Sequence, residues 1–237
     1  MKRFSKIFIL LLCFIMIFTA CPAWTADDES FLDVIMKKAN DGDAESQYFL
    51  GHMYDYGELV AQDSNEAFKW YKKAADQEHI EALFMTGFMY HKGWGVRQDD
   101  SEAVKYYLKA AENEHVAAQY NLALAYYNGL GVRQDYSEAM KWYKKAADNG
   151  LADAQYNLGV MYYKGEGLRE NYAEAVKYYR KAAEQGHIKA QYNLGLMYLN
   201  GNGIKKNSVR AKNWLREAAR QGHPQAQETL NKLGEKW

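Results

Sequence analysis

Apolar residues recur every three or four positions along most of this chain, and the whole pattern repeats every 36 residues. In residues 117–127, Ala118, Leu122 and Ala125 fall on one face of a helix. A second stretch of the same kind begins at Asp135. The spacing therefore predicts two helices in each repeat, each with one buried face.

The repeat keeps its register across the chain. The sequence Ala-Gln-Tyr-Asn-Leu occurs three times, with its glutamine at Gln119, Gln155 and Gln191. A strict period of this size predicts a stacked array in which each unit buries its apolar face against its neighbours. Residues 27–237 are accordingly predicted to form one array, with five full units (44–79, 80–115, 116–151, 152–187 and 188–223) and capping half-units at 30–43 and 224–234.

Polar residues mark the expected ends of the helices. Asn128-Gly129 ends the first helix of the third unit, because glycine adopts the left-handed conformation that follows a helix. Asp135 and Glu138 have the spacing of a capping box, in which each side chain accepts the other's backbone N–H. The same spacing recurs at Asp63/Glu66, Asp99/Glu102 and Asn171/Glu174 but lapses at Asn207/Arg210.

The first 26 residues have the pattern of a secretory signal peptide. Lys2, Arg3 and Lys6 precede an almost wholly apolar run at 7–20, and small residues follow. A lipoprotein leader ending at Ala20 would leave Cys21 as the site of lipid attachment, and cleavage after Ala23 or Ala26 is the alternative. A membrane-spanning helix needs about 20 apolar residues and is the weaker interpretation. We therefore expect an exported protein, periplasmic or secreted, with a lipid anchor to the envelope as an open alternative.

Composition excludes several classes of protein. The net charge of the 237 residues is zero, so the basic face of a nucleic-acid-binding protein is not expected. Both cysteines, Cys13 and Cys21, lie in or beside the leader, which leaves the array without thiol nucleophiles or cysteine ligands for zinc. The sequence contains neither His-Glu-x-x-His nor a serine hydrolase motif. We expect no enzymatic activity, metal or cofactor.

The repeated unit A-x-x-Q-Y-N-L-G-x-M-Y-x-x-G-x-G-V-x-x-D-Y-x-E-A-x-K-W-Y-x-K-A-A-x-x-G resembles the Sel-one-like repeat, a subclass of the tetratricopeptide family, over about residues 38–234. This resemblance implies an all-α fold, a right-handed α-solenoid whose concave groove is lined by the first helices. It also implies an adaptor or scaffold that binds a protein or peptide.

The histidines and the Gly-x-Gly turns recur with the repeat, so a structural role explains them more simply than a catalytic or phosphate-binding one. Four histidines share one position, just before a first helix, at His79, His115, His187 and His223. The Gly-x-Gly runs follow helices, whereas a phosphate-binding loop follows a strand. Neither pattern predicts a catalytic site.

Packing like that of tetratricopeptide repeats would direct three rows of side chains toward the groove. Asparagine amides can bond a peptide backbone, and tyrosine rings can cover apolar side chains. The alternative is that both residue types hold neighbouring units together. The rows comprise Tyr120, Tyr156 and Tyr192; Asn121, Asn157 and Asn193; and Tyr127 and Tyr163.

The second unit departs most from the repeat. Phe84, Met85 and Phe88 replace more polar or smaller residues, and exposed apolar clusters mark partner sites. We predict that these three residues anchor an apolar segment of a partner. A cell-envelope hydrolase related to β-lactamases or to peptidoglycan enzymes, and a lipid-anchored structural component of an envelope assembly, are the alternatives to an adaptor.

Overall fold

The computed structural model describes residues 30–237, so the predicted signal peptide and Cys21 lie outside the described residues. The described chain is entirely helical apart from its turns. Its helices are α2 (Phe31–Asn40), α3 (Ala44–Tyr56), α4 (Ser64–Ala75), α5 (Ile80–Lys92), α6 (Asp100–Glu112), α7 (Val116–Asn128), α8 (Tyr136–Asp148), α9 (Ala152–Lys164), α10 (Tyr172–Glu184), α11 (Ile188–Asn200), α12 (Ser208–Arg220) and α13 (Pro224–Lys232).

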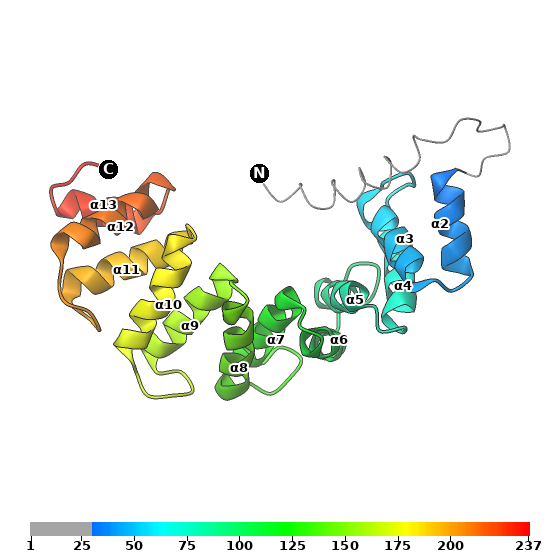
Figure 1. The fold of residues 1–237 in the computed structure, drawn as a ribbon, viewed down its shortest axis with the longest axis horizontal. Coiled ribbons are helices and arrows are strands. Elements are labelled where there is room, and N and C mark those ends of the chain that lie inside the picture. Colours follow the sequence, from blue (N-terminus) through cyan, green and yellow to red (C-terminus); the bar gives the residue numbers. More distant parts are fainter. Residues whose placement is uncertain (1–29) are drawn as a thin grey trace.

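Each helix packs mainly on the helices before and after it in the sequence. The resulting stack follows an open arc, with α2–α4 in one arm, α11–α13 in the other and α5–α8 at its bottom (Figure 1). At the bottom of the arc, α5 and α7 lie nearer the inner side than α6 and α8 (Figure 1). The predicted all-α solenoid of helix pairs is confirmed.

Small residues let the helices approach closely, and large ones fill the space between units. The paired alanines at the end of each second helix, such as Ala146 and Ala147, are buried. Leu122 and Tyr143 are also buried, at no more than 1% exposure. Burial of a leucine side chain is worth roughly 1.5–3 kcal/mol. The buried residues therefore form a row of clusters, a seam that runs along the array, rather than one central cluster.

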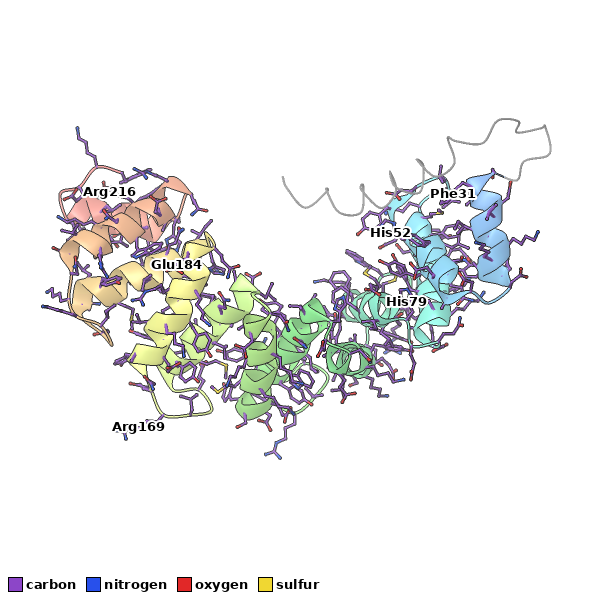
Figure 2. The ribbon with its side chains drawn as sticks, viewed as in Figure 1. Phe31, His52, His79, Arg169, Glu184 and Arg216 are labelled. Atoms are coloured by element: carbon purple, nitrogen blue, oxygen red, sulfur yellow. The ribbon has the colours of Figure 1, made fainter. Side chains whose placement is uncertain are left out.

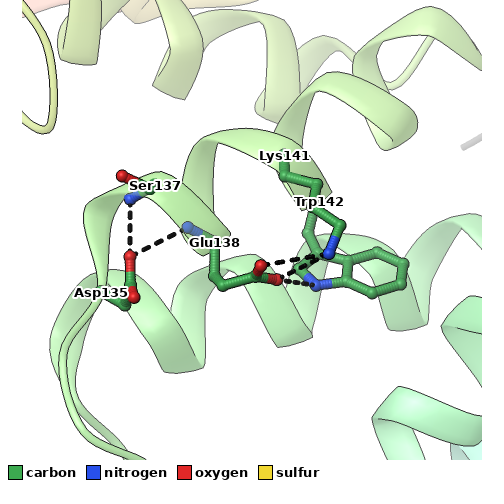
Figure 3. A network of polar contacts seen from close by, with 5 residues as sticks. All are labelled: Asp135, Ser137, Glu138, Lys141 and Trp142. Carbon is green, nitrogen blue, oxygen red and sulfur yellow. Dashed lines mark hydrogen bonds and ion pairs between the residues drawn. The ribbon is translucent and has the colours of Figure 1, made fainter.

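The second helices are capped differently from the prediction. The Asp135 carboxylate accepts the backbone N–H groups of Ser137 and Glu138, as expected (Figure 3). However, the backbone N–H of Asp135 donates to the Tyr126 carbonyl at 2.9 Å. The Glu138 carboxylate therefore does not accept this N–H. It accepts hydrogen bonds from the Lys141 ammonium and the Trp142 indole N–H instead (Figure 3).

The prediction of reciprocal capping boxes in the repeats was therefore wrong in its second half. The same backbone bond, from the cap residue to a tyrosine carbonyl 9 residues earlier, recurs at Asp63, Asp99, Asn171 and Asn207. A true capping box forms at Ser30, whose hydroxyl accepts from the Asp33 N–H while the Asp33 carboxylate accepts from the Ser30 N–H.

The repeated glutamine holds one unit to the next. The side-chain amide of Gln119 donates to the Ala111 carbonyl at 3.2 Å, bridging the turn between α6 and α7. Gln47, Gln155, Gln191 and Gln227 make the equivalent bond. Because exposed backbone carbonyls at helix ends need partners, this bond explains why the glutamine keeps its place in the repeat.

The four repeated histidines are structural, as predicted. Each is the N-cap of a first helix, where its Nδ1 accepts the backbone N–H three residues later; for His115 this bond to Ala118 is 3.1 Å. Leu151 occupies the same position before α9 and supplies no side-chain cap.

The described residues contain no helix both long and apolar enough to cross a membrane.

Candidate protein-binding surface

The first predicted row of tyrosines packs on the histidine caps. The ring of Tyr156 stacks on His187 with centroids 4.6 Å apart, and Tyr192 stacks on His223 at 4.5 Å. In the third unit Leu151 replaces the histidine, and the Tyr120 ring lies with its centroid 5.8 Å from that of Tyr143. Each of these three tyrosines is half-buried, and those on α9 and α11 contact the N-cap of the next first helix.

The asparagine row lies against tyrosine hydroxyls. The Asn157 amide donates to the Tyr120 hydroxyl at 3.4 Å, linking α9 to α7. Burial raises the pKa of Tyr156, and contact with the Asn193 amide opposes that rise. Asn121 likewise opposes the effect of burial on the pKa of Tyr107. These contacts match the packing alternative, and a role for the three asparagines in partner binding stays a prediction.

The third row is divided between packing and exposure. The Tyr127 hydroxyl donates to the Glu166 carboxylate at 2.7 Å, which ties α7 to the loop of the next unit. Burial, together with that carboxylate, raises the pKa of Tyr127. Tyr163 is 40% exposed and contacts Tyr172 with ring centroids 5.3 Å apart. Tyr163 is therefore the member of this row that is most available to a partner.

The second unit carries an aromatic surface that we call the α5 patch, formed by Phe84, Phe88 and Trp94. The Phe84 and Phe88 rings lie 6.2 Å apart, and Trp94 meets Phe88 edge-on at 5.5 Å. Trp94 is 49% exposed. Met85, the third residue that we predicted as an anchor, is half-buried like Phe84 and Phe88 and packs against the core formed by Ala67, Tyr71 and Met89. Its role in partner binding stays a prediction.

The prediction from sequence omitted Trp94, although a signal was present. Trp94 occupies the middle of a Gly-x-Gly turn, where the other units have Glu58, Leu130, Glu166 and Asn202. A tryptophan in an exposed turn loses the stabilisation that burial of its ring would give, so its presence there indicates a binding surface.

A cavity of about 110 Å³ lies between α5, α6 and α7. His91 and Asp100 line it, with His91 Nδ1 2.7 Å from an Asp100 carboxylate oxygen. In the next unit, Tyr127 and Tyr136 occupy these positions and pack with ring centroids 5.4 Å apart. The smaller histidine and aspartate leave space beside Tyr107 and Asn121, which line the same cavity.

No cluster of three or more histidine, cysteine or acidic residues that could hold a metal occurs in residues 30–237. The His91–Asp100 pair has no serine, threonine or cysteine among the other residues that line the cavity. The surface can therefore supply ring faces, amides and one small cavity. It is suited to contact with another polypeptide.

An array of stacked helix pairs with a repeated inter-unit clamp and an exposed aromatic patch defines an α-solenoid of the protein-interaction type. The chain belongs to the Sel1 repeat family, which matches it at residues 44–79, 80–115, 116–151, 152–187 and 188–223.

Solved bacterial structures share this architecture. A protective antigen from uropathogenic Escherichia coli that displays an SLR fold is 37% identical, with a TM-score of 0.83 over 85% of this chain. A Sel1 repeat protein from Oxalobacter formigenes is 35% identical, with a TM-score of 0.73 over 80% of this chain and 75% of its own. The match spans 43% of the antigen's length.

A curated relative is more distant. The chitin synthase regulator SKT5 of Saccharomyces cerevisiae is 33% identical over 67 residues, which are 28% of this chain and 10% of the yeast protein.

Proposed function

We propose that this protein is an exported adaptor that binds a protein or peptide partner on the inner side of its arc. The Sel1 repeat array is a protein-interaction fold, and the family indicates no enzymatic activity. Support for the binding site comes from the α5 patch, where Trp94 stays 49% exposed beside two further aromatic rings. Exposed aromatic anchors of this kind dominate the energetics of protein interfaces.

Phe88 and Trp94 would contact the partner directly in this proposal. Phe84 has its ring stacked on His115 at 4.5 Å and would support Phe88 from beneath. The tyrosine and asparagine rows would guide an extended segment along the first helices toward Tyr163.

Site-specific photocrosslinking tests the location of the binding site. A benzophenone amino acid placed at Trp94 is expected to crosslink one specific partner in the native host. The same group placed at Arg169, on the outer edge of the arc (Figure 2), is the control and should give no such product. Equal crosslinking from both positions would contradict a site on the α5 patch.

Substitutions test the contribution of the aromatic rings. Phe88→Ser combined with Trp94→Ser should abolish capture of the crosslinked partner while the array stays folded by circular dichroism. Val209→Ser is the matched control because Val209 is an exposed apolar residue, at 67%, on the distant helix α12. Unchanged capture by the double variant would overturn the proposed role of the patch.

The export proposal depends on the leader at residues 1–26. Intact-mass analysis of protein from a native-like bacterial host separates its outcomes. A lipid mass on Cys21 would indicate an envelope-tethered adaptor, and a start after Ala23 or Ala26 would indicate a diffusible one. An uncleaved N-terminus beginning at Met1 would contradict both processing routes.

A further inference from the structure

The fifth unit reverses the charge pattern of the second helices. In the four preceding units, a glutamate in the first turn pairs with a lysine three residues later, as in Glu174–Lys177 at 3.1 Å. The fifth unit has Arg210 and Asn213 at these two positions, and Glu217 where the fourth unit has Lys181.

This reversal brings two guanidinium groups onto one tyrosine. Arg180 of α10 and Arg210 of α12 each donate to the Tyr198 hydroxyl oxygen, both at 3.2 Å. Burial tends to raise the pKa of Tyr198, but the hydrogen bonds from Arg210 and Arg180 outweigh that effect and lower it. The tyrosine is 3% exposed, Arg180 is half-buried and Arg210 is exposed, so the two guanidinium groups meet at a buried tyrosine in a surface depression.

Neither arginine has an acidic partner within the described chain: no carboxylate lies within 4.0 Å of either guanidinium in residues 30–237. The depression has a volume of about 570 Å³ and is lined by Arg180, Arg210, Tyr198, Trp214, Asn213, Glu184 and Glu217. Two like charges held together without a counter-ion form a preorganised site for an anion, because guanidinium groups bind carboxylates with two parallel hydrogen bonds.

The acidic residues at the rim restrict the anion that fits. Glu217 is paired with Arg220 at 2.9 Å, whereas Glu184 lies exposed at the end of α10 (labelled in Figure 2). A dianionic phosphate would be repelled by these two carboxylates. A singly charged carboxylate would accept hydrogen bonds from the arginines, the backbone N–H beside it would donate to the Glu184 carboxylate, and the Trp214 ring would cover apolar atoms.

We propose that Arg180, Arg210 and Tyr198 form a binding site for a carboxylate of a polypeptide, either an acidic side chain or a chain terminus. This proposal rests on the proposed function, because the carboxylate would belong to the partner polypeptide. The site lies on α10, α11 and α12 of the fourth and fifth units, whereas the α5 patch lies on the second, and it would bind a second region of a bound partner.

The test uses short blocked peptides and the indole N–H signals of Trp214 and Trp94 in nitrogen-15 NMR spectra, assigned with Trp214→Phe and Trp94→Phe. A blocked peptide with one glutamate, or one with a free terminal carboxylate, should shift the Trp214 signal saturably. The glutamine analogue with both ends blocked should not. Arg180→Gln should weaken binding roughly tenfold or more, because one guanidinium is lost.

Lys144→Gln is the matched control, since Lys144 holds the position of Arg180 one unit earlier and is exposed. It should bind the glutamate peptide like the unmodified protein. Tyr198→Phe keeps the buried ring and should weaken binding without unfolding the array, which separates binding from stability.

Three outcomes would overturn the site: equal shifts from the glutamate and glutamine peptides, equal losses in Arg180→Gln and Lys144→Gln, or saturation by inorganic phosphate but by neither carboxylate peptide. The proposed function is tested separately, by crosslinking of a partner at Trp94. If the Trp214 signal does not shift with either carboxylate peptide while Trp94 still crosslinks a partner, only the carboxylate site is rejected.

Discussion

The side-chain amide of Gln185 donates a hydrogen bond of 2.7 Å to the side-chain carbonyl of Gln155, which lies 30 residues earlier. Gln155 in turn donates to the Ala147 carbonyl at 3.1 Å. The two bonds form a partly buried chain that joins the end of one second helix to the end of the next. Gln221 with Gln191 and Gln77 with Gln47 repeat the arrangement.

The chain of amides is broken at Gln119. Its partner position holds Asn149, which is one methylene shorter and donates to the Lys145 carbonyl of its own helix instead. The buried Oε1 of Gln119 is left without a donor. We predict that Asn149→Gln restores the bond and raises the free energy of unfolding by about 1 kcal/mol, measured by urea denaturation.

Asn113→Gln is the control for this prediction. Asn113 has the same position one unit earlier, but its partner position holds Leu83, which has no acceptor. The longer side chain should therefore add no stability there. An equal gain from both substitutions would show that the effect comes from helix propensity and not from the amide chain.

Two glutamates occupy a backbone conformation that favours glycine. Glu78 and Glu114 follow second helices with φ of 64° and 63°, whereas the equivalent Gly150 has φ of 89°. A left-handed conformation costs a residue with a side chain roughly 1–2 kcal/mol. We predict that Glu114→Gly raises the melting temperature of the array by relieving about 1 kcal/mol.

Gly150→Ala tests the same argument in the opposite direction. A Cβ atom at Gly150 would meet no atom within 4 Å, so only the backbone conformation is penalised. The melting temperature should fall. A neutral result for both variants would indicate that these turns relax freely.

The architecture could be predicted because every unit repeats the same pattern of buried and helix-ending residues. The alanine pairs, the helix-ending glycines and the four capping histidines all occupy the places expected from the period. What failed was the reciprocal capping box, since a backbone carbonyl had already taken the N–H of Asp135. Sequence spacing identifies which side chains are near a helix end, but not which of several acceptors obtains the bond.

The surface was harder to predict for a related reason. The period shows which residues of a first helix lie on one face. It does not show whether a ring such as Tyr156 faces a partner or the histidine that caps the next first helix, because that depends on how closely the helices pack. The 4.6 Å contact of Tyr156 with His187 depends on how α9 packs beside the start of α11. Trp94 and the arginine pair at Tyr198 are departures from the repeat, and single departures carry no periodic signal.

Overpacking of the alanine seam should destabilise the array. Ala146 is fully buried, at 0% exposure, in the seam between neighbouring units. Ala146→Leu adds three carbon atoms where no space exists and should cost about 1–3 kcal/mol of unfolding free energy. Lys144→Leu on the exposed face of the same helix is the control. An unchanged urea midpoint for Ala146→Leu would show that the seam can open without loss of stability.

Acid should weaken the array through its histidine caps. The Nδ1 of His115 accepts the Ala118 N–H, which requires that nitrogen to be unprotonated. Burial lowers the pKa of His115 below its ordinary 6.5, although the Glu81 carboxylate opposes this. Burial also lowers the pKa of His187, against the nearby Asp153, and that of His223, where Lys189 acts in the same direction.

A histidine whose pKa is lower in the folded state is favoured there as the neutral form. Its contribution to stability is complete above pH 6.5 and is lost as the pH falls through the folded-state pKa. The melting temperature should therefore decrease on acidification from neutral pH. Replacing His115, His187 and His223 with asparagine keeps a capping acceptor that does not titrate, so the triple variant should show a flatter dependence on pH. An identical slope in the triple variant would assign the acid sensitivity to carboxylates elsewhere in the array.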